Sequence, residues 1–339
     1  MKAGVILSKK KSKKNPYLVD INKINFFYGV PHCHTNISTG KGSPSECIEM
    51  AYRNDLDFLI LTDHNSAFEK DTKMSHWSTT NKLISKYNKR ASIFLVLHGF
   101  ETHSSEWGHF NIINPKNYFS GTVTNINALV LWSLKDKNTL ISINHPHNSV
   151  LEIPFSPLIN TAITNIEVAN GIFGKKYTKH DKIYYNMLDK GWKLSSINGQ
   201  DNHKLNIGKE ENLTAIISPL LTEESLIYAL KNHHTFSTES KSLKMYFTIN
   251  SAFMGSTILA KDSKLLKFFV NIEDSIRKIS KVQIITSTGR VVKEISNLEI
   301  HTVKFMYQQI PSFAEKWYVV KILLNDKREA ISSPIFLEF

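Results

Sequence analysis

Ionisable residues recur in this sequence at the ends of short apolar runs. Five such runs lead into His, Asp or Glu within a few positions. They are Phe26–Val30 before His32-Cys33-His34, Asp57–Leu61 before Thr62-Asp63-His64, Ile93–Leu97 before His98 and Glu101, Thr139–Ile143 before Asn144-His145-Pro146, and Lys193–Ile197 before Asp201 and His203. Because active-site residues of βα barrels lie at the C-terminal ends of the strands, these side chains are expected to converge.

The first group shows what such a convergence could do. If the strand continues, His32 and His34 point to one face and Cys33 points to the other. Two imidazoles on one face can chelate a single metal ion. Together with carboxylates they form a mixed nitrogen and oxygen set that suits Zn²⁺, Mn²⁺ or Fe²⁺. The pattern therefore predicts a metal centre, with Cys33 as a small apolar filler on the other side.

The remaining histidines fit this pattern less well. His109 stands at the start of an apolar run, so a ligand, a surface residue and a core residue are all compatible with its position. His98, His103 and His147 lie near the predicted ligands but are weaker candidates. Five others follow no such pattern and are expected to be structural or exposed: His76, His180, His233, His234 and His301.

The elements that must position these residues alternate between strand and helix over residues 25–240. This alternation is typical of an α/β fold around a parallel sheet. Further strands are expected at Phe110–Ile113, Thr164–Val168 and Leu213–Ile217, and helices at Pro44–Arg53, 79–90, 125–135, 178–190 and 222–232. Ser43 is the expected N-cap of the first helix with Pro44 at its first position, and Thr222 opens the last.

The pattern changes after residue 240. Short β-rich segments separated by turn residues extend to the C-terminus: Lys244–Ile249, Lys267–Ile272, Lys281–Ile285, Thr302–Tyr307, Trp317–Ile322 and Ile335–Phe339. They predict a second domain at 243–339, an Ig-like antiparallel β-sandwich without a catalytic constellation. We expect it to pack on the first domain as a rigid partner, and independent proteolytic release of this domain would argue against that.

Composition narrows the possible classes. The 339 residues are 41% hydrophobic and 21% charged, as in ordinary globular proteins. No apolar run reaches the ~20 residues that span a bilayer, and two cysteines cannot build a disulfide framework. Residues 1–24 carry +6 of the net charge of +12 and are expected to form a basic, partly flexible segment. The expectation is a cytoplasmic protein with no membrane partner and an anionic ligand.

The ordered motif set resembles one known family. His-x-His, Thr-Asp-His-Asn, Glu, Gly-His, His-Pro and Asp-x-His follow one another as in the PHP (polymerase and histidinol phosphatase) superfamily. The resemblance covers about residues 30–340 and looks closest to the carbaryl-hydrolase-like branch, whose members also carry a C-terminal β-domain. It implies a distorted (β/α)7 TIM-like barrel at residues 25–240 with two or three divalent metal ions.

The resemblance also implies which residues hold the metals. His32, His34, Glu101 and Asp201 would hold the first ion. Glu101 would bridge to a second ion completed by His109 and His145, and His64 and His203 would contribute to a third. Many relatives have an Asp where this chain has Thr39, a poor ligand, so the third site is expected to be weak, water-completed or empty.

Two such ions would activate a shared water, giving a bridging hydroxide near neutral pH. We expect Glu101 and Asp201 to act in catalysis, with Asp201 or His147 moving the proton to the leaving group. Asp63 is expected to orient a ligand by accepting an imidazole N–H. Lys41, in a Gly-flanked loop just after the first ligands, could face a phosphate, although a flexible turn with an exposed Lys fits equally.

Four functions are compatible with these features. The favoured one is a phosphoesterase acting on a small phosphorylated metabolite or nucleotide. A carbamate or amide hydrolase could use the same centre and would need an apolar pocket, for which Trp77, Trp107, Trp132 and Tyr177 are available. A nucleic-acid-binding or processing protein would use the basic segment, with binding that weakens steeply in salt. The fourth is a degenerate barrel in which the metal ions are structural and the β-domain serves as the binding module.

Overall fold

The strands of the N-terminal part form one sheet whose edges approach each other. The computed structural model describes residues 23–70, 75–90, 93–172 and 176–339. The strands are β1 (Asn25–Val30), β2 (Phe58–Leu61), β3 (Leu95–Ser104), β4 (Gly108–Ile113), β5 (Leu140–Ile143), β6 (Ile163–Asn170), β7 (Thr178–Lys179), β8 (Ser195–Gly199), β9 (Leu213–Ser218) and β10 (Thr235–Thr238). Each of the eight strands expected before residue 220 is present, with shifted ends. The basic segment predicted at residues 1–24 lies outside the described residues, apart from its last two.

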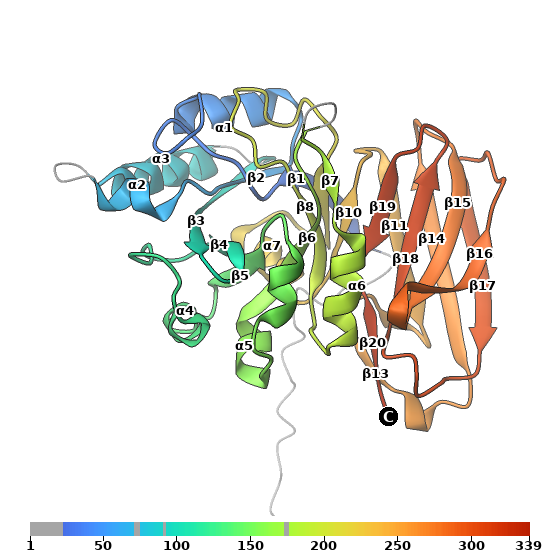
Figure 1. Cartoon of the computed structure of the whole chain (residues 1–339). Coiled ribbons are helices and arrows are strands. Elements are labelled where there is room, and N and C mark those ends of the chain that lie inside the picture. The colour runs from blue at the N-terminus through green and yellow to red at the C-terminus, as the bar shows by residue number, and fades with distance from the viewer. Residues whose placement is uncertain (1–22, 71–74, 91–92, 173–175) are drawn as a thin grey trace, which may run out of the picture.

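Helices connect most of these strands (Figure 1). They are α1 (Pro44–Arg53), α2 (Asn65–Glu69), α3 (His76–Arg90), α4 (Ile126–Ser133), α5 (Pro157–Ala162), α6 (Asp181–Asp189) and α7 (Glu223–Lys231). Ser43 caps α1 in a capping box with Glu46, and Thr222 caps α7, so both predicted helix starts are confirmed. In the described part of the chain, no helix is both long and apolar enough to cross a membrane.

The sheet is mixed rather than wholly parallel. β1 pairs in parallel with β2, and β2 with β3. β5 pairs in parallel with β6, and β6 with β8. Between these blocks β4 runs antiparallel to both β3 and β5, and at the other side β9 runs antiparallel to β1. The expected series of βα units is therefore interrupted at two strands.

Side chains from opposite parts of the sheet meet in one core. Phe58 of β2, Leu97 of β3 and Ile197 of β8 share a buried cluster with apolar residues of α7. β8 lies beside β9 and β10 but has no backbone ladder with either of them among the described residues. Instead the Thr214 side chain of β9 bonds both the N–H and the C=O of Asn198 in β8. The sheet thus wraps around a core, with side-chain bonds between β8 and β9.

The C-terminal part is built of β-strands, as the segment pattern predicted, and these form a separate four-stranded sheet and a continuation of the sheet that contains β1–β10. One contains β12 (Ala252–Phe253), β11 (Leu243–Ile249), β14 (Leu266–Asp274) and β17 (Thr302–Gln309) in that order. The other contains β13 (Thr257–Leu259), β20 (Ile335–Glu338), β18 (Trp317–Leu324), β19 (Glu329–Ser332), β15 (Ile279–Thr286) and β16 (Arg290–Ile295). Pairing is antiparallel except between β13 and β20. Two 3₁₀ turns, Ala260–Asp262 and Ser287–Gly289, lie between strands.

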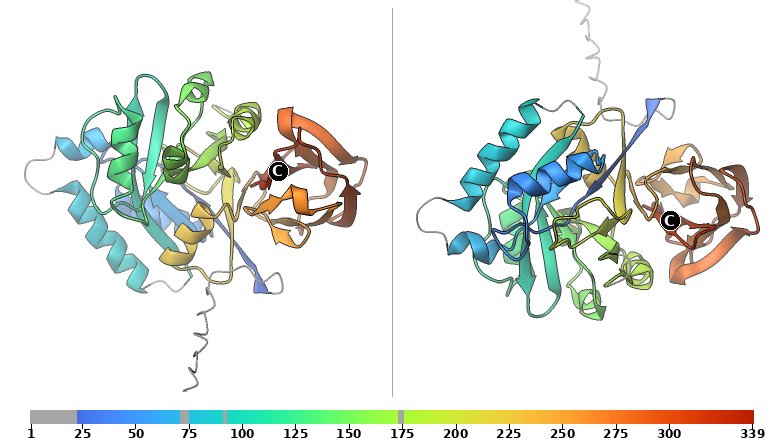
Figure 2. Two further views of the ribbon diagram at one scale, coloured as in Figure 1. Left: turned by 90° about the horizontal axis from the view of Figure 1, so that it is seen from below. Right: turned by 90° about the horizontal axis from the view of Figure 1, so that it is seen from above.

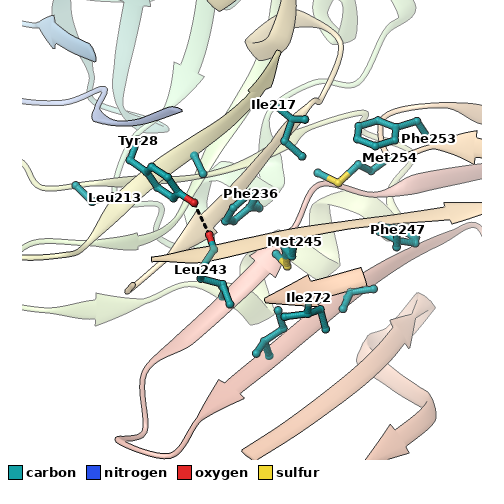
Figure 3. Packing of buried hydrophobic residues seen from close by; sticks show 14 of the residues in the cluster. Tyr28, Leu213, Ile217, Phe236, Leu243, Met245, Phe247, Phe253, Met254 and Ile272 are labelled. Atoms are coloured by element: carbon teal, nitrogen blue, oxygen red, sulfur yellow. Dashed lines mark hydrogen bonds between the residues drawn. The ribbon is translucent and has the colours of Figure 1, made fainter. Parts of the chain in front are cut away.

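The two parts lie side by side (Figures 1 and 2) and share hydrogen bonds and a core. β10 pairs antiparallel with β9 on one side and with β19 on the other, so the wrapped sheet continues into the C-terminal part. The Tyr28 hydroxyl of β1 donates to the carbonyl of Leu243, 2.6 Å away, and both belong to a buried cluster that includes Phe236 and Phe268 (Figure 3). Backbone pairing and burial therefore connect the strands that precede residue 240 to those that follow it.

One buried histidine makes stability depend on pH. His98 stacks on Trp77 with ring centroids 3.8 Å apart, and its Nδ1 donates to Asn81. Burial lowers the pKa of His98 to about 3, so the folded protein keeps it neutral while the unfolded chain binds a proton below about pH 6.5. The unfolded state then holds more protons, and this contribution to stability is complete above pH 6.5 and falls as the pH drops toward 3.

We expect the stability of His98→Gln to fall by about 2–3 kcal/mol less than that of the unmodified protein between pH 6.5 and 4.5. The estimate follows because one proton changes the free energy of unfolding by ~1.4 kcal/mol per pH unit. Urea unfolding of both proteins at the two pH values measures this difference. An unchanged pH dependence in the variant would contradict it.

Candidate metal centre

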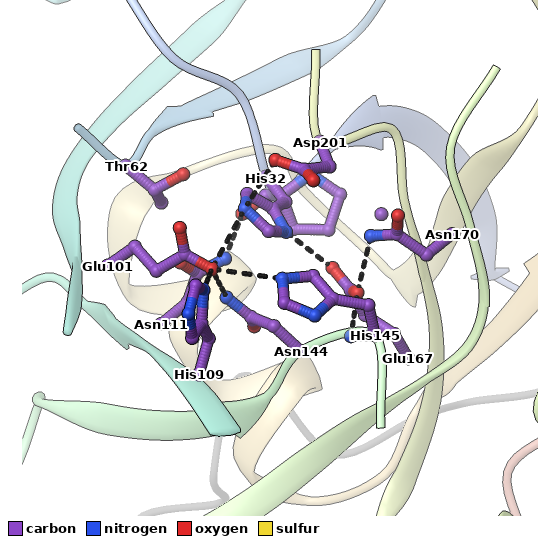
Figure 4. Close-up of polar contacts among 12 residues, drawn as sticks. His32, Thr62, Glu101, His109, Asn111, Asn144, His145, Glu167, Asn170 and Asp201 are labelled. Atoms are coloured by element: carbon purple, nitrogen blue, oxygen red, sulfur yellow. Dashed lines mark hydrogen bonds and ion pairs between the residues drawn. The ribbon is translucent and has the colours of Figure 1, made fainter. Parts of the chain in front are cut away.

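The predicted ligands come together at one end of the wrapped sheet (Figure 4). Three groups of side chains have ligand atoms within 4.8 Å of one another. They are His32, His34, Glu101 and Asp201; Glu101, His109 and His145; and His34, His64 and His203. All eight side chains that the sequence proposed as ligands are included.

Glu101 is the residue that joins these groups. Its carboxylate is 1% exposed at the C-terminal half of β3. Oε1 lies 3.1 Å from His109 Nδ1 and 3.3 Å from His145 Nε2. Oε2 lies 3.4 Å from His34 Nε2 and 3.2 Å from His64 Nδ1. Oε1 also lies 3.4 Å from His32 Nε2. Glu101 therefore contacts imidazoles of all three groups, as a bridging carboxylate would.

His32 and His34 face the same side, as the alternation predicted. β1 ends at Val30, but Cys33 forms an isolated bridge with Asn202, and the His34 N–H donates to the Asn202 carbonyl. The Nε2 atoms of the two imidazoles are 3.3 Å apart, and Asp201 Oδ1 lies 3.3 Å and 3.1 Å from them. Cys33 points away into the apolar core, which confirms its expected role as a filler.

The direction of β4 explains the position of His109. His109 is the second residue of β4 and pairs with His103 near the end of β3. Because β4 runs antiparallel, its beginning lies beside the C-terminal ends of its neighbours. A ligand at the start of a strand therefore reaches the same mouth as ligands at the ends of parallel strands.

The third group consists of imidazoles alone. The His34 ring stacks on that of His203 at 4.3 Å between centroids and lies 4.6 Å from that of His64. Burial, opposed by Glu101 and helped by the neighbouring histidines, lowers the pKa of His64 to about 4, so His64 is neutral at pH 7. Thr39, which the resemblance led us to expect as a poor ligand for this group, is exposed.

At the first group, burial and neighbouring charges shift the pKa values in opposite directions. Burial favours neutral His32, yet Glu167, Glu101 and Asp201 outweigh it and raise the pKa of that imidazole. Burial likewise disfavours charged Glu101, but His32, His109 and His145 hold its pKa well below the usual range. The pKa of Asp201 is also lowered, against burial, by His32 and His34. The carboxylates are therefore ionised and available to a cation.

Two of these residues hold strained backbone conformations. His145 has φ 25° and Asp201 has φ 46°, in the left-handed region that residues other than glycine rarely adopt. Such conformations cost about 1–3 kcal/mol each and persist where the surroundings impose them, often at functional sites. The surrounding structure therefore holds these two residues in unfavourable backbone conformations, and these conformations set the direction of their side chains.

Asp63 holds the ligands in a way the sequence did not anticipate. Among the described residues its carboxylate accepts from Thr35 and Ser38, at 2.8 Å from the Thr35 N–H, and from no imidazole. His34 Nδ1 lies 3.4 Å from Ser38 Oγ. The expected direct imidazole contact is thus replaced by one through Ser38, because Asp63 points to the 35–38 turn rather than to His64.

The other proposed residues lie at the rim. Lys41 is exposed, and its backbone N–H donates to the His203 carbonyl 3.1 Å away. His147 is exposed at the N-cap of a 3₁₀ turn, Asn148–Glu152, two residues after His145. His103 is exposed with its ring 5.0 Å from that of His109, whereas His98 is buried against Trp77.

Two further buried residues contact the predicted ligands, and the sequence pattern did not predict their contacts. Asn144 Nδ2 donates to Glu101 Oε1 at 2.8 Å. Glu167, in the middle of β6, accepts from His32 Nδ1 at 2.8 Å and is fully buried. A charged residue inside an apolar strand is itself unusual, because Glu is almost never fully buried unless it is paired. Its place in the run Ile163–Asn170 could therefore have identified it.

The donor set fits divalent metal ions. Imidazole nitrogens and carboxylate oxygens are the ligands of zinc and similar transition metals. The Nε2 atoms of His32 and His34 face each other across a short gap beside two ionised carboxylates, so they converge on a point where a cation would be shared. The clusters can thus hold a metal ion.

Comparison with solved structures finds the same fold. A two-domain protein containing a predicted PHP-like metal-dependent phosphoesterase, from Bacteroides vulgatus, aligns over 97% of this chain and 100% of its own, with 17% identity and a TM-score of 0.54. PsfC from Pseudomonas syringae (13% identity, 61% and 90% coverage) has a TM-score of 0.45. A protein from Bifidobacterium adolescentis, for which metal-dependent phosphoesterase activity is inferred, aligns over 60% of this chain and 94% of its own. Its sequence identity is 15% and its TM-score is 0.34. No protein-family model and no curated protein matches.

Proposed function

We propose that this chain is a metal-dependent hydrolase of the PHP superfamily, in its carbaryl-hydrolase-like branch, and that it hydrolyses phosphoesters. The observation that carries this proposal is the carboxylate of Glu101, whose two oxygens contact imidazoles of all three groups. Such a bridge supports two ions about 3.5–4 Å apart, the spacing used by two-metal phosphatases. In this proposal the wrapped sheet is a distorted (β/α)7 barrel.

The three groups of side chains correspond to three sites. His32, His34, Glu101 and Asp201 hold the first ion, and Glu101, His109 and His145 hold the second. His64 and His203 with His34 form a third, weaker site, since Thr39 adds no carboxylate. The ions are Zn²⁺, Mn²⁺ or Fe²⁺, which mixed nitrogen and oxygen sets accept.

When bound, the ions supply an activated water nucleophile and stabilise the charge that develops on phosphoryl oxygens. Asp201 is 29% exposed and in contact with His32 and His34, so it can pass a proton between the buried site and the opening. In this proposal His147, an exposed residue two positions after His145, delivers a proton to the leaving group.

The polar opening favours a phosphoester over a carbamate. The partly exposed side chains of the centre are imidazoles and one carboxylate: His64, His109, His145, His203 and Asp201. Trp77 and Trp107 are buried in the apolar core, and Trp132 packs against it. Tyr177 donates its hydroxyl to Glu239. These aromatic residues are thus engaged in packing and hydrogen bonds, and Lys41 remains at the rim to attract a small anionic substrate.

The test combines metal analysis of the purified protein with a hydrolysis screen of phosphate monoesters and diesters, and of carbamates and amides. We expect bound Zn, Mn or Fe and turnover of a phosphoester. Turnover should fall by at least ~100-fold in His34→Ala and in Asp201→Ala, because loss of a residue that merely orients a ligand already costs about 10–100-fold. Circular dichroism checks that both variants fold.

His301→Ala is a matched control, since His301 lies between β16 and β17 and bonds the Asp274 carbonyl, far in sequence from the centre. Activity that survives in folded His34→Ala and Asp201→Ala would overturn the catalytic assignment. Turnover of carbamates alone would overturn the substrate class and leave the metal centre in place.

A further inference from the structure

Glu167, in the interior of the sheet, contacts one predicted ligand of each of the first two metal sites. Its side chain is fully buried at the centre of β6. Oε1 accepts from His32 Nδ1 at 2.8 Å, and Oε2 accepts from the backbone N–H of His145 at 2.6 Å and from Asn170 Nδ2 at 2.7 Å (Figure 4). His32 belongs to the first group and His145 to the second. One carboxylate therefore links a ligand of each.

The surrounding strands reserve space for this carboxylate. A Cβ atom on Gly199 of β8 would lie 1.8 Å from Glu167 Oε1, and its three nearest neighbours would all be Glu167 atoms. The pairing of β6 with β8 also shifts register between Glu167 and Ala169, and such bulges redirect side chains. The missing side chain at 199 thus makes room for the Glu167 carboxylate.

Each contact fixes something that metal binding requires. A hydrogen on His32 Nδ1 leaves the Nε2 lone pair free, and Nε2 faces Glu101 and Asp201. The bond to the His145 N–H holds a residue whose φ of 25° is unfavourable without such support. The imidazole of one site and the strained backbone of the other are both positioned by the same group.

We propose that Glu167 is a positioning residue that couples the two metal sites, by fixing the His32 imidazole and the His145 backbone at once. This inference rests on the metal centre proposed above. It predicts that a change at Glu167 weakens both sites together, although Glu167 itself contacts neither substrate nor metal.

The hydrogen-bond pattern makes Glu167→Gln informative. All three partners of Glu167 are donors, and an amide offers one acceptor oxygen where the carboxylate offers two. If the amide NH₂ of the Glu167→Gln side chain faced His32, its hydrogens would oppose the hydrogen on Nδ1. If it faced His145, its hydrogens would oppose the His145 N–H and the Asn170 amide. A side chain of equal size therefore cannot satisfy both ligands.

The probe is Co²⁺ added to the full-length protein after chelation, followed by affinity titration and visible absorption. We expect Glu167→Gln to weaken Co²⁺ binding by about 10–100-fold at both sites and to change the absorption bands. Glu315→Gln is the matched control, because Glu315 is a similarly buried glutamate that bonds Arg290 and Tyr318 in the C-terminal part. It should leave both readouts unchanged.

A double-mutant cycle tests the mechanism independently of how well the Gln variant folds. Gly199→Ala alone should weaken Co²⁺ binding about as much as Glu167→Gln, because its methyl group displaces the carboxylate. In a Glu167→Ala background the three atoms nearest to this methyl group are gone, so Glu167→Ala and Glu167→Ala/Gly199→Ala should agree within about twofold.

Two outcomes would overturn the inference: unchanged Co²⁺ affinity and spectrum in folded Glu167→Gln, or an equal effect of Gly199→Ala with and without Glu167. Neither readout requires turnover. If the protein binds Co²⁺ as expected but hydrolyses no phosphoester, the proposed function fails while the role of Glu167 stands. If the unmodified protein binds no Co²⁺, the metal centre itself is wrong.

Discussion

Glu101→Gln is expected to remove metal binding and hydrolysis together. Both carboxylate oxygens face imidazoles, and an amide nitrogen in place of one oxygen would present hydrogens to one of the two sets. The negative charge shared by the two ions would also be lost from a site that is 1% exposed. We expect turnover to fall on the order of 10³-fold, comparable with loss of a major transition-state contact.

Metal content after dialysis and kcat/KM for the best phosphoester from the screen measure this effect. Glu315→Gln again serves as the buried-glutamate control, with both quantities expected to match the unmodified protein. A Glu101→Gln protein that keeps two ions and stays within tenfold of full activity would show that Glu101 does not bridge.

Removal of the metal ions is expected to destabilise the protein strongly. Ions that bind the folded chain at about 1,000 times their dissociation constant contribute roughly 4 kcal/mol each, so two contribute about 8 kcal/mol. At about 2 °C per kcal/mol for a chain longer than 250 residues, Tm should fall by about 16 °C on chelation. The loss follows because Glu101, Asp201 and Glu167 are left facing one another with only imidazoles between them.

Calorimetry before and after treatment with a chelator, and after re-addition of Zn²⁺ or Mn²⁺, measures the shift. Recovery of Tm on re-addition separates metal binding from irreversible damage. His34→Ala should show a low Tm that responds little to either treatment. A Tm that is indifferent to chelation in the unmodified protein would contradict the proposed centre.

Much of the local structure could be predicted from the sequence because local rules decide it. Ser43 and Pro44 set the start of α1, since one caps the helix and the other suits its first turn. The buried strands β2 and β5 stand out as apolar runs bounded by ionisable residues. These runs also located most of the candidate ligands, because strand ends determine where side chains emerge.

What could not be predicted depends on strand direction and on long-range contacts. His109 was ambiguous because no local pattern shows that β4 runs antiparallel. Asp63 was assigned a direct imidazole contact, whereas the 35–38 turn, which folds back onto it, takes its oxygens. Glu167 meets His32 across 135 positions, and Gly199 accommodates it from another strand. Such contacts follow only from how the sheet wraps.

The shared strand β10 has a mechanical consequence. Its two edges are bonded to β9 and to β19, so the C-terminal sheets cannot swing against the ligand-bearing strands without breaking backbone hydrogen bonds. Hinged closure around a ligand, common in enzymes with two lobes, is unavailable along this seam. Along this seam the C-terminal sheets and the ligand-bearing strands therefore move as one body.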